Sequence, residues 1–244
     1  TYFFDFIIKL TANKKKQEVD KHLLLNLIAL RNDLLKIAND DNTVHLLILR
    51  SLFIKYLEDK KIYPQNYWTN ILNEKSPEKV LSAFNEIKRI NGNIFDEELP
   101  LEKINVEYIS LLHLFFISDY RSGQQSLFPY LFDKIPVQLI SHVYEAFLKS
   151  KYKKGKGIYY TPSFVVNFML SHSLADKLQT NNNITILDPA VGSGAFLVES
   201  LKMIFQNNPD LTFEQKKKVL QNQLFGIDID RKALQIAAFS LYLT

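Results

Sequence analysis

The chain contains no cysteine, which excludes a disulfide framework and any zinc site built on thiolates. It also has no apolar run near the ~20 residues that a membrane-spanning helix needs. The opening stretch Thr1–Leu10 is apolar, but no basic segment precedes it and no small-residue cleavage site follows, so it is a poor signal peptide. We therefore expect a cytoplasmic protein.

Glycine is scarce as well and unevenly placed. Five of the seven glycines in these 244 residues fall between Gly155 and Gly226. The first 154 residues thus have little backbone freedom for positive φ angles, which favours helices joined by polar loops. We predict a domain boundary near residue 150, with a helical amino-terminal domain over 1–150 and a second domain over 151–244. The net charge of +4 is a mild indication of a polyanionic partner.

Apolar residues recur at helical spacing through the first region. They predict helices from about Val19 to Ala38, from Thr43 as the N-cap to about Asp59, from Val106 to Ile117 and from Val137 to Leu148. The residues expected on the inward faces are Leu23, Leu27, Leu30, Leu34, Leu46, Leu47, Leu49, Phe53, Ile54, Leu57, Leu139, Ile140, Val143, Phe147 and Leu148.

Catalytic candidates in this region are weak. The histidines are scattered, without the spacing that two ligands of one metal need on a helix, so no metal site is predicted. Glu58-Asp59-Lys60 and Glu86-Ile87-Lys88 match the short Glu-x-Lys pattern of metal-dependent nucleases. Both lie within helical periodicity, which favours solvated helix faces over a nuclease site.

The second region has the pattern of a ligand-binding turn. Ile184–Leu187 is a short β-rich apolar run that predicts a buried strand. It leads into Asp188-Pro-Ala-Val-Gly-Ser-Gly-Ala-Phe-Leu197 and then into a helical stretch through about Phe205. In a strand, glycine turn and helix of this kind, a ligand sits above the carboxyl end of the strand. Gly192 and Gly194 would let the backbone approach that ligand closely.

Two ligands compete for this turn. A dinucleotide site requires Gly-x-Gly-x-x-Gly with a pyrophosphate at the helix N-terminus, but Leu197 occupies the third glycine position. Asp188 would repel a pyrophosphate and attract the ammonium group of an amino acid. The residues therefore favour S-adenosylmethionine over NAD.

A second strand is predicted at about Leu224–Ile227, followed by Asp228-Ile229-Asp230. A carboxylate at the end of this strand can accept hydrogen bonds from both ribose hydroxyls, a role we assign to Asp228. Ile229 can pack on the adenine ring. Asp230 lies just ahead of a predicted helix over 231–243, where a helix cap is the competing interpretation.

Three motifs in this order resemble those of adenine-N6 DNA methyltransferases from restriction-modification systems. Asp188–Leu197 resembles their cofactor motif, Gly157-Ile-Tyr-Tyr-Thr-Pro162 their Tyr-Thr-Pro motif, and Phe225–Asp230 the motif that follows. The likeness extends over about residues 20–244 and is closest to fused type II enzymes and type I modification subunits. It implies a cofactor site for S-adenosylmethionine formed by Tyr160, Thr161, Pro162, Asp188, Pro189, Ala190, Gly192, Gly194, Phe196, Asp228 and Ile229.

The resemblance implies an α-helical amino-terminal domain followed by the first part of an α/β Rossmann-like methyltransferase domain. The implied activity is methyl transfer to the N6 amino group of adenine in duplex DNA, whose target base must leave the stack. The catalytic Asn/Asp-Pro-Pro-Tyr/Phe motif is absent from these residues, so we expect no catalytic residue and no activity here.

Alternatives are a methyltransferase with a non-DNA substrate and a non-catalytic assembly module. Beyond DNA, the implied partner is a specificity or endonuclease subunit. Five lysines within 149–156 form either a solvated linker or a contact to the DNA backbone.

Overall fold

The computed structural model describes residues 21–38, 40–91, 98–124, 130, 132, 161, 163–181 and 183–244. The chain divides into two compact units, Thr1–Ile135 and Pro136–Thr244. The predicted domain boundary near residue 150 lies outside the described residues, as does the predicted helix over 137–148. Within the described residues, none of the helices has the length and apolarity that crossing a membrane requires.

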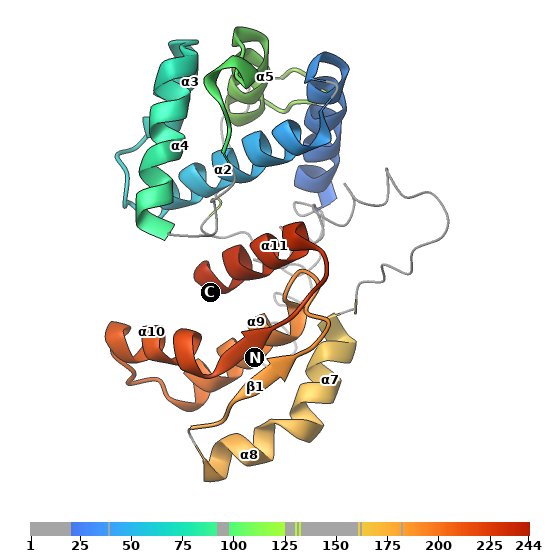
Figure 1. Cartoon of the computed structure of the whole chain (residues 1–244), viewed down its shortest axis with the longest axis vertical. Helices are drawn as coiled ribbons and strands as arrows, with labels where there is room; N and C mark the ends of the chain where they lie inside the picture. Colours follow the sequence, from blue (N-terminus) through green and yellow to red (C-terminus); the bar gives the residue numbers. More distant parts are fainter. Residues whose placement is uncertain are drawn as a thin grey trace, which may run out of the picture. The chain divides into compact units, whose positions relative to one another are not determined.

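The described part of the first unit is helical (Figure 1). Residues 21–38 are helical, and the later elements are α2 (Asp41–Asp59), α3 (Tyr67–Asn73), α4 (Pro77–Asn91), the short 3₁₀ helix η2 (Leu101–Lys103) and α5 (Val106–Ile117). Helix α2 contacts α3 and α4, while α3 packs on α5. Three of the predicted helices are thereby confirmed, and the described inward-facing leucines, Phe53 and Ile54 are all buried.

The N-cap predicted for α2 is wrong by three residues. Asp40 caps the helix, because its carboxylate accepts hydrogen bonds from the Asn42 backbone N–H at 3.1 Å and the Thr43 hydroxyl at 2.6 Å. Lys103 Nζ donates to the same carboxylate at 3.0 Å. Thr43 therefore supports the cap from inside the first turn, where its own backbone is already helical.

The prediction of solvated helix faces is also wrong for Glu58 and Asp59. Glu58 is buried, the Asp59 side chain is only 9% exposed, and both carboxylates share the Lys55 ammonium group, at 2.6 Å from Glu58 Oε1 and 3.0 Å from Asp59 Oδ1. Glu58 also accepts the backbone N–H groups of Asn66 and Trp68, both at 3.0 Å. It thus satisfies the start of α3, where Asn66 makes no side-chain cap of its own. The predicted helix is confirmed, but its buried residues lie on nearly every side of α2.

The second unit contains a two-stranded parallel sheet and five helices among its described residues (Figure 1). The elements run α7 (Ser163–Ser173), α8 (Ala175–Thr180), β1 (Ile186–Asp188), α9 (Ala195–Asn207), α10 (Phe213–Asn222), β2 (Leu224–Gly226) and α11 (Arg231–Tyr242). Strand β1 pairs with β2 in the register Ile186↔Leu224, Leu187↔Phe225 and Asp188↔Gly226. The predicted strands, glycine turn and following helices are present, whereas α10 was not predicted.

One face of this sheet packs against the core. Leu224 is buried, and Ile186 packs on a cluster that includes Leu197 and Leu201 of α9. On the other face Leu187 is 57% exposed and Phe225 is 45% exposed. The prediction of a buried first strand is therefore wrong for Leu187, because successive side chains of a strand point to opposite faces and only one face is covered by described residues.

Candidate functional site

The candidate site lies where the two strands end, because parallel pairing brings the loops after β1 and β2 to the same edge of the sheet. Backbone hydrogen bonds join these loops directly. The Ile227 N–H donates to the Asp188 carbonyl at 2.9 Å, and the Val191 N–H donates to the Ile227 carbonyl at 2.9 Å. The fold thus brings together residues predicted from two separate motifs. Gly192 and Asp228, for example, are 36 positions apart along the chain.

The glycines of these loops have different surroundings. Gly192 has a φ of +52°, and a Cβ built on it would meet no atom within 4 Å. Gly194 has a φ of +89° as the N-cap of α9, and a Cβ there would lie 3.0 Å from the backbone of Ala237. Gly192 therefore borders open space, while Gly194 allows the turn to pack closely against α11.

Gly226 is a residue for which the sequence analysis gave no role. A Cβ on it would lie 2.9 Å from Val191 Cγ2 and 3.1 Å from Leu197 Cδ1. Its lack of a side chain lets the turn after β1 pack over the end of β2. A glycine within a predicted strand, two residues before the acidic residue of the motif, is the sequence signal for this role.

The three carboxylates of the site have different partners. Asp188 Oδ1 accepts from the Ala190 N–H at 3.1 Å, within its own turn. Asp228 accepts from the Gly192 N–H at 2.9 Å and from the Asp230 N–H at 2.8 Å. Asp230 accepts from the Lys232 N–H at 2.9 Å and caps α11, so the capping interpretation of Asp230 is confirmed.

The other predicted site residues fall in several environments. Pro189 and Ala190 are exposed in the turn, and the Ile229 side chain is fully exposed beside it. Phe196 is partly buried and packs against the core of the unit. Thr161 is half-buried just ahead of α7, while Tyr160 and Pro162 lie outside the described residues.

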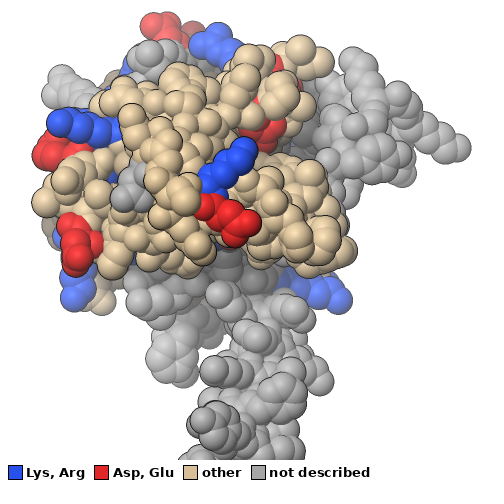
Figure 2. All heavy atoms as spheres, turned by 90° about the horizontal axis from the view of Figure 1, so that it is seen from below, with Lys and Arg blue, Asp and Glu red and all other residues tan. Residues whose placement is uncertain are grey.

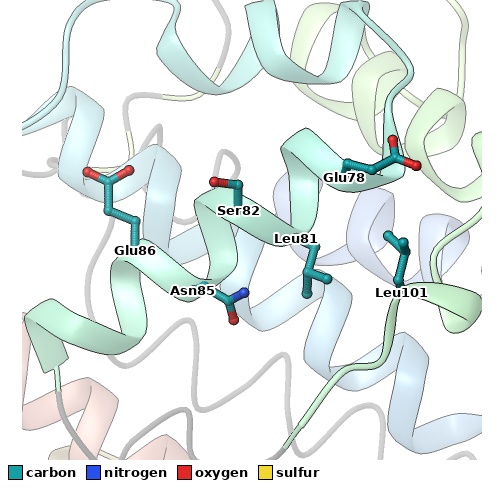
Figure 3. Close-up of a pocket in the computed structure, with 6 residues that line it drawn as sticks. All are labelled: Glu78, Leu81, Ser82, Asn85, Glu86 and Leu101. Atoms are coloured by element: carbon teal, nitrogen blue, oxygen red, sulfur yellow. The ribbon is translucent and has the colours of Figure 1, made fainter.

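A separate groove lies in the first unit along α4 (Figure 3). It encloses about 610 Å³ and is lined by Glu78, Leu81, Ser82, Asn85, Glu86 and Leu101. Tyr67 donates from its hydroxyl to Glu86 at 3.0 Å, and burial together with this hydrogen bond raises the pKa of Tyr67 to about 12. None of the predicted cofactor residues lines the groove, and its two carboxylates would repel a phosphate backbone.

Figure 2 shows one face of the molecule, on which uncharged residues dominate. The lysines and arginines of the described residues on this face are scattered, and most of them lie near acidic side chains. The described residues on this face therefore form none of the continuous basic surface that typifies a DNA-binding patch. The lysine-rich segment 149–156 lies outside the described residues.

Comparison with known proteins indicates the class of protein that this chain resembles. Residues 137–244 match the family model described as N-6 DNA Methylase. This stretch contains both loops of the candidate site and every predicted cofactor residue. The predicted resemblance to adenine-N6 DNA methyltransferases is confirmed by this match.

Individual relatives come from restriction-modification systems. A putative type II restriction enzyme and methyltransferase of Methanocaldococcus jannaschii, RM.MjaORFECS2P, is 24% identical over 81% of this chain and 24% of its own length. The type II restriction enzyme and methyltransferase RM.BcgI of Heyndrickxia coagulans is 31% identical over 43% of this chain and 16% of its own length. The chain thus spans about a quarter or less of the length of these relatives.

A solved structure of the ATP-dependent Type ISP restriction-modification enzyme LlaBIII bound to DNA also matches. It is 17% identical, with a TM-score of 0.40 over 93% of this chain and 16% of that one.

Proposed function

We propose that this chain is part of a site-specific DNA methyltransferase that modifies the N6 amino group of adenine in a restriction-modification system. The observation that carries the proposal is the junction of two acidic loops, after β1 and after β2, within the stretch that matches the N-6 DNA methylase family. A Rossmann-like domain would use this edge of its sheet for the cofactor. Duplex DNA would be the substrate, with a specificity or endonuclease subunit as a further partner.

The residues present fit S-adenosylmethionine. Open space at Gly192 leaves room for a ligand beside the turn, and the Asp188 carboxylate offers a counter-charge for an ammonium group. Asp228 retains acceptor capacity for ribose hydroxyls, since an ionised carboxylate offers about four acceptor positions and two backbone N–H groups use two of them. The exposed Ile229 side chain is available to pack on an adenine ring.

When bound, S-adenosylmethionine supplies an electrophilic methyl group. The chain's own residues would hold the ligand in a fixed position and orientation, and positioning of two reactants accounts for much of the acceleration of such a displacement. The sequence contains no Asn/Asp-Pro-Pro-Tyr/Phe motif, so we assign the holding of the flipped adenine to none of its residues.

Tritium transfer from labelled S-adenosylmethionine to mixed-sequence duplex DNA tests the proposal. The 244-residue chain is compared with a longer form that includes the catalytic motif and a recognition domain. We expect transfer to adenine by the longer form only. Transfer to RNA, protein or a small molecule in place of DNA would favour the other class of methyltransferase, and transfer by the 244-residue chain would reveal an adenine pocket within it.

The role of Asp228 is tested by the Asp228→Ala variant of the longer form. We expect S-adenosylmethionine binding to weaken by roughly 1–3 kcal/mol, because the ribose hydroxyls lose a charged acceptor. Isothermal titration calorimetry measures this change. An unaltered affinity would remove Asp228 from the cofactor site.

A further inference from the structure

The turn after β1 is fastened to the loop after β2 by a side chain as well as by backbone. Two backbone hydrogen bonds, from Ile227 to Asp188 and from Val191 to Ile227, bring the loops side by side. The third link is the Gly192 N–H, which donates to Asp228 Oδ2 at 2.9 Å. This is the link that reaches the tip of the turn, where Gly192 adopts a positive φ.

A glycine at this position has no conformation imposed by its own side chain. Glycine loses more conformational freedom on ordering than any other residue, so an isolated Gly192 would populate several backbone regions. A Cβ at Gly192 would meet no neighbour within 4 Å, so close packing does not hold this residue in place. The Gly194 N–H closes the turn around Gly192 by donating to the Val191 carbonyl at 2.8 Å, and the hydrogen bond to Asp228 is the one that the Gly192 backbone itself makes.

The Asp228 carboxylate is itself held in a fixed orientation. Its second oxygen, Oδ1, accepts from the Asp230 N–H at 2.8 Å. Asp230 in turn is anchored as the N-cap of α11. The position of the Gly192 turn is thereby tied to the first turn of α11 through one side chain.

We propose that Asp228 is a positioning residue for the Gly192 turn, in addition to its proposed contact with ribose. Each carboxylate oxygen uses one acceptor position for a backbone N–H and keeps another. One side chain would therefore shape the methionine side of the site and bind the ribose side. The inference deepens the proposed function, and only its ligand-bound consequence rests on that function.

Amide hydrogen exchange of the ligand-free 244-residue chain, followed by NMR, tests the positioning role without any methyl donor. The quantity scored is the protection of the Gly192 amide relative to that of Val198, whose N–H donates to Gly194 within α9 at 2.9 Å. In the Asp228→Asn variant, the amide side chain retains a single acceptor oxygen. We expect the Gly192 amide to exchange about tenfold faster, with Val198 unchanged, because the single remaining oxygen must serve either Gly192 or Asp230 and carries no charge to strengthen the hydrogen bond.

Asp230→Asn is the matched control. It removes one negative charge from the same loop and leaves the Asp230 backbone N–H in place, and asparagine is as good an N-cap as aspartate. The ratio of Gly192 to Val198 protection should stay unchanged in this variant. An unchanged ratio in Asp228→Asn, or an equal loss in both variants, would overturn the positioning role.

Should Asp228→Asn fail to fold, Asp228→Glu gives the same decision, because its carboxylate is displaced by one methylene group while the charge is kept. Faster exchange at Gly192 with α9 protected supports the proposal, and an unchanged ratio overturns it. Adding S-adenosylmethionine to the unaltered chain forms a separate arm. On binding, the Gly192 amide should remain protected, and loss of its protection would contradict simultaneous use of the carboxylate. Absence of binding bears on the proposed function of this chain and leaves the exchange result standing.

Discussion

The two units use their carboxylates in opposite ways. In the first unit, the Glu58 side chain is buried and that of Asp59 is only 9% exposed, and both carboxylates pair with the Lys55 ammonium group. In the second unit, Asp188 and Asp228 lie half-buried at the ends of two strands, where backbone N–H groups use only part of their acceptor capacity. Acidic residues alone therefore say little about function, and burial together with a paired cation separates the structural carboxylates of the first unit from the half-buried ones that can bind a ligand.

Lys55→Met is the variant from which we expect the largest loss of stability. Methionine keeps the aliphatic part of the side chain but leaves two buried carboxylates without their cation. We expect the unfolding free energy of the first unit to fall by about 3–5 kcal/mol. Urea denaturation followed by fluorescence of Trp68, the sole tryptophan in the chain and a fully buried one, measures the change.

Lys79→Met is the control for this prediction. Lys79 pairs with Glu74 on the surface, where both side chains are about half exposed, so the loss should stay below about 1 kcal/mol. Equal losses in the two variants would contradict a structural role for the buried cluster.

The contribution of Lys55 should also depend on pH. Burial by itself would lower the pKa of Lys55, but the hydrogen bonds to Glu58 and Asp59 outweigh burial, so the pKa is raised. The stability that Lys55 contributes should therefore persist up to the ordinary lysine pKa of about 10.4 and decline above it.

Alanine substitutions at Gly194 and Gly192 test whether the two glycines of the second unit have different roles. Both residues have positive φ angles, which cost a side chain about 1–2 kcal/mol. Gly194→Ala adds a contact of 3.0 Å with the Ala237 backbone, so its total loss should reach about 2–4 kcal/mol. The opening free energy from amide exchange of Val198 measures both effects. A larger loss at Gly192 than at Gly194 would contradict the assignment of Gly194 to packing and Gly192 to open space.

Asp40→Ala has the smallest expected effect, about 1 kcal/mol, from loss of the α2 cap. Hydrogen bonds from Thr43 and Lys103 lower the pKa of Asp40 to about 2. A lowered pKa means that the stabilisation is present above the unfolded value near 3.9 and is lost as the pH falls through about 2. The difference in unfolding free energy between Asp40→Ala and the unaltered chain should therefore shrink between pH 4 and pH 2. Urea titrations at several pH values in this range, read by Trp68 fluorescence, provide the check, and a constant difference would show that the charge of Asp40 contributes nothing.

Much of the fold followed from local sequence patterns. Leucine spacing predicted the helices of the first unit because an amphipathic helix records its buried face in its own sequence. Glycines between a β-rich run and a helical run predicted the turn after β1, since few other residues adopt its φ angles. Details that depend on neighbouring elements were missed, including the exposure of Leu187, the burial of Glu58 and the packing role of Gly226.

The sequence by itself determined the candidate site residues, their order and the resemblance to adenine-N6 DNA methyltransferases, because short motifs contain the residue types that the chemistry needs. Only the tertiary structure decided which carboxylates are already occupied by backbone N–H groups and that Gly192 and Asp228 are in contact. Hydrogen bonds between residues 36 positions apart depend on the parallel pairing of two strands, and no local pattern specifies that pairing.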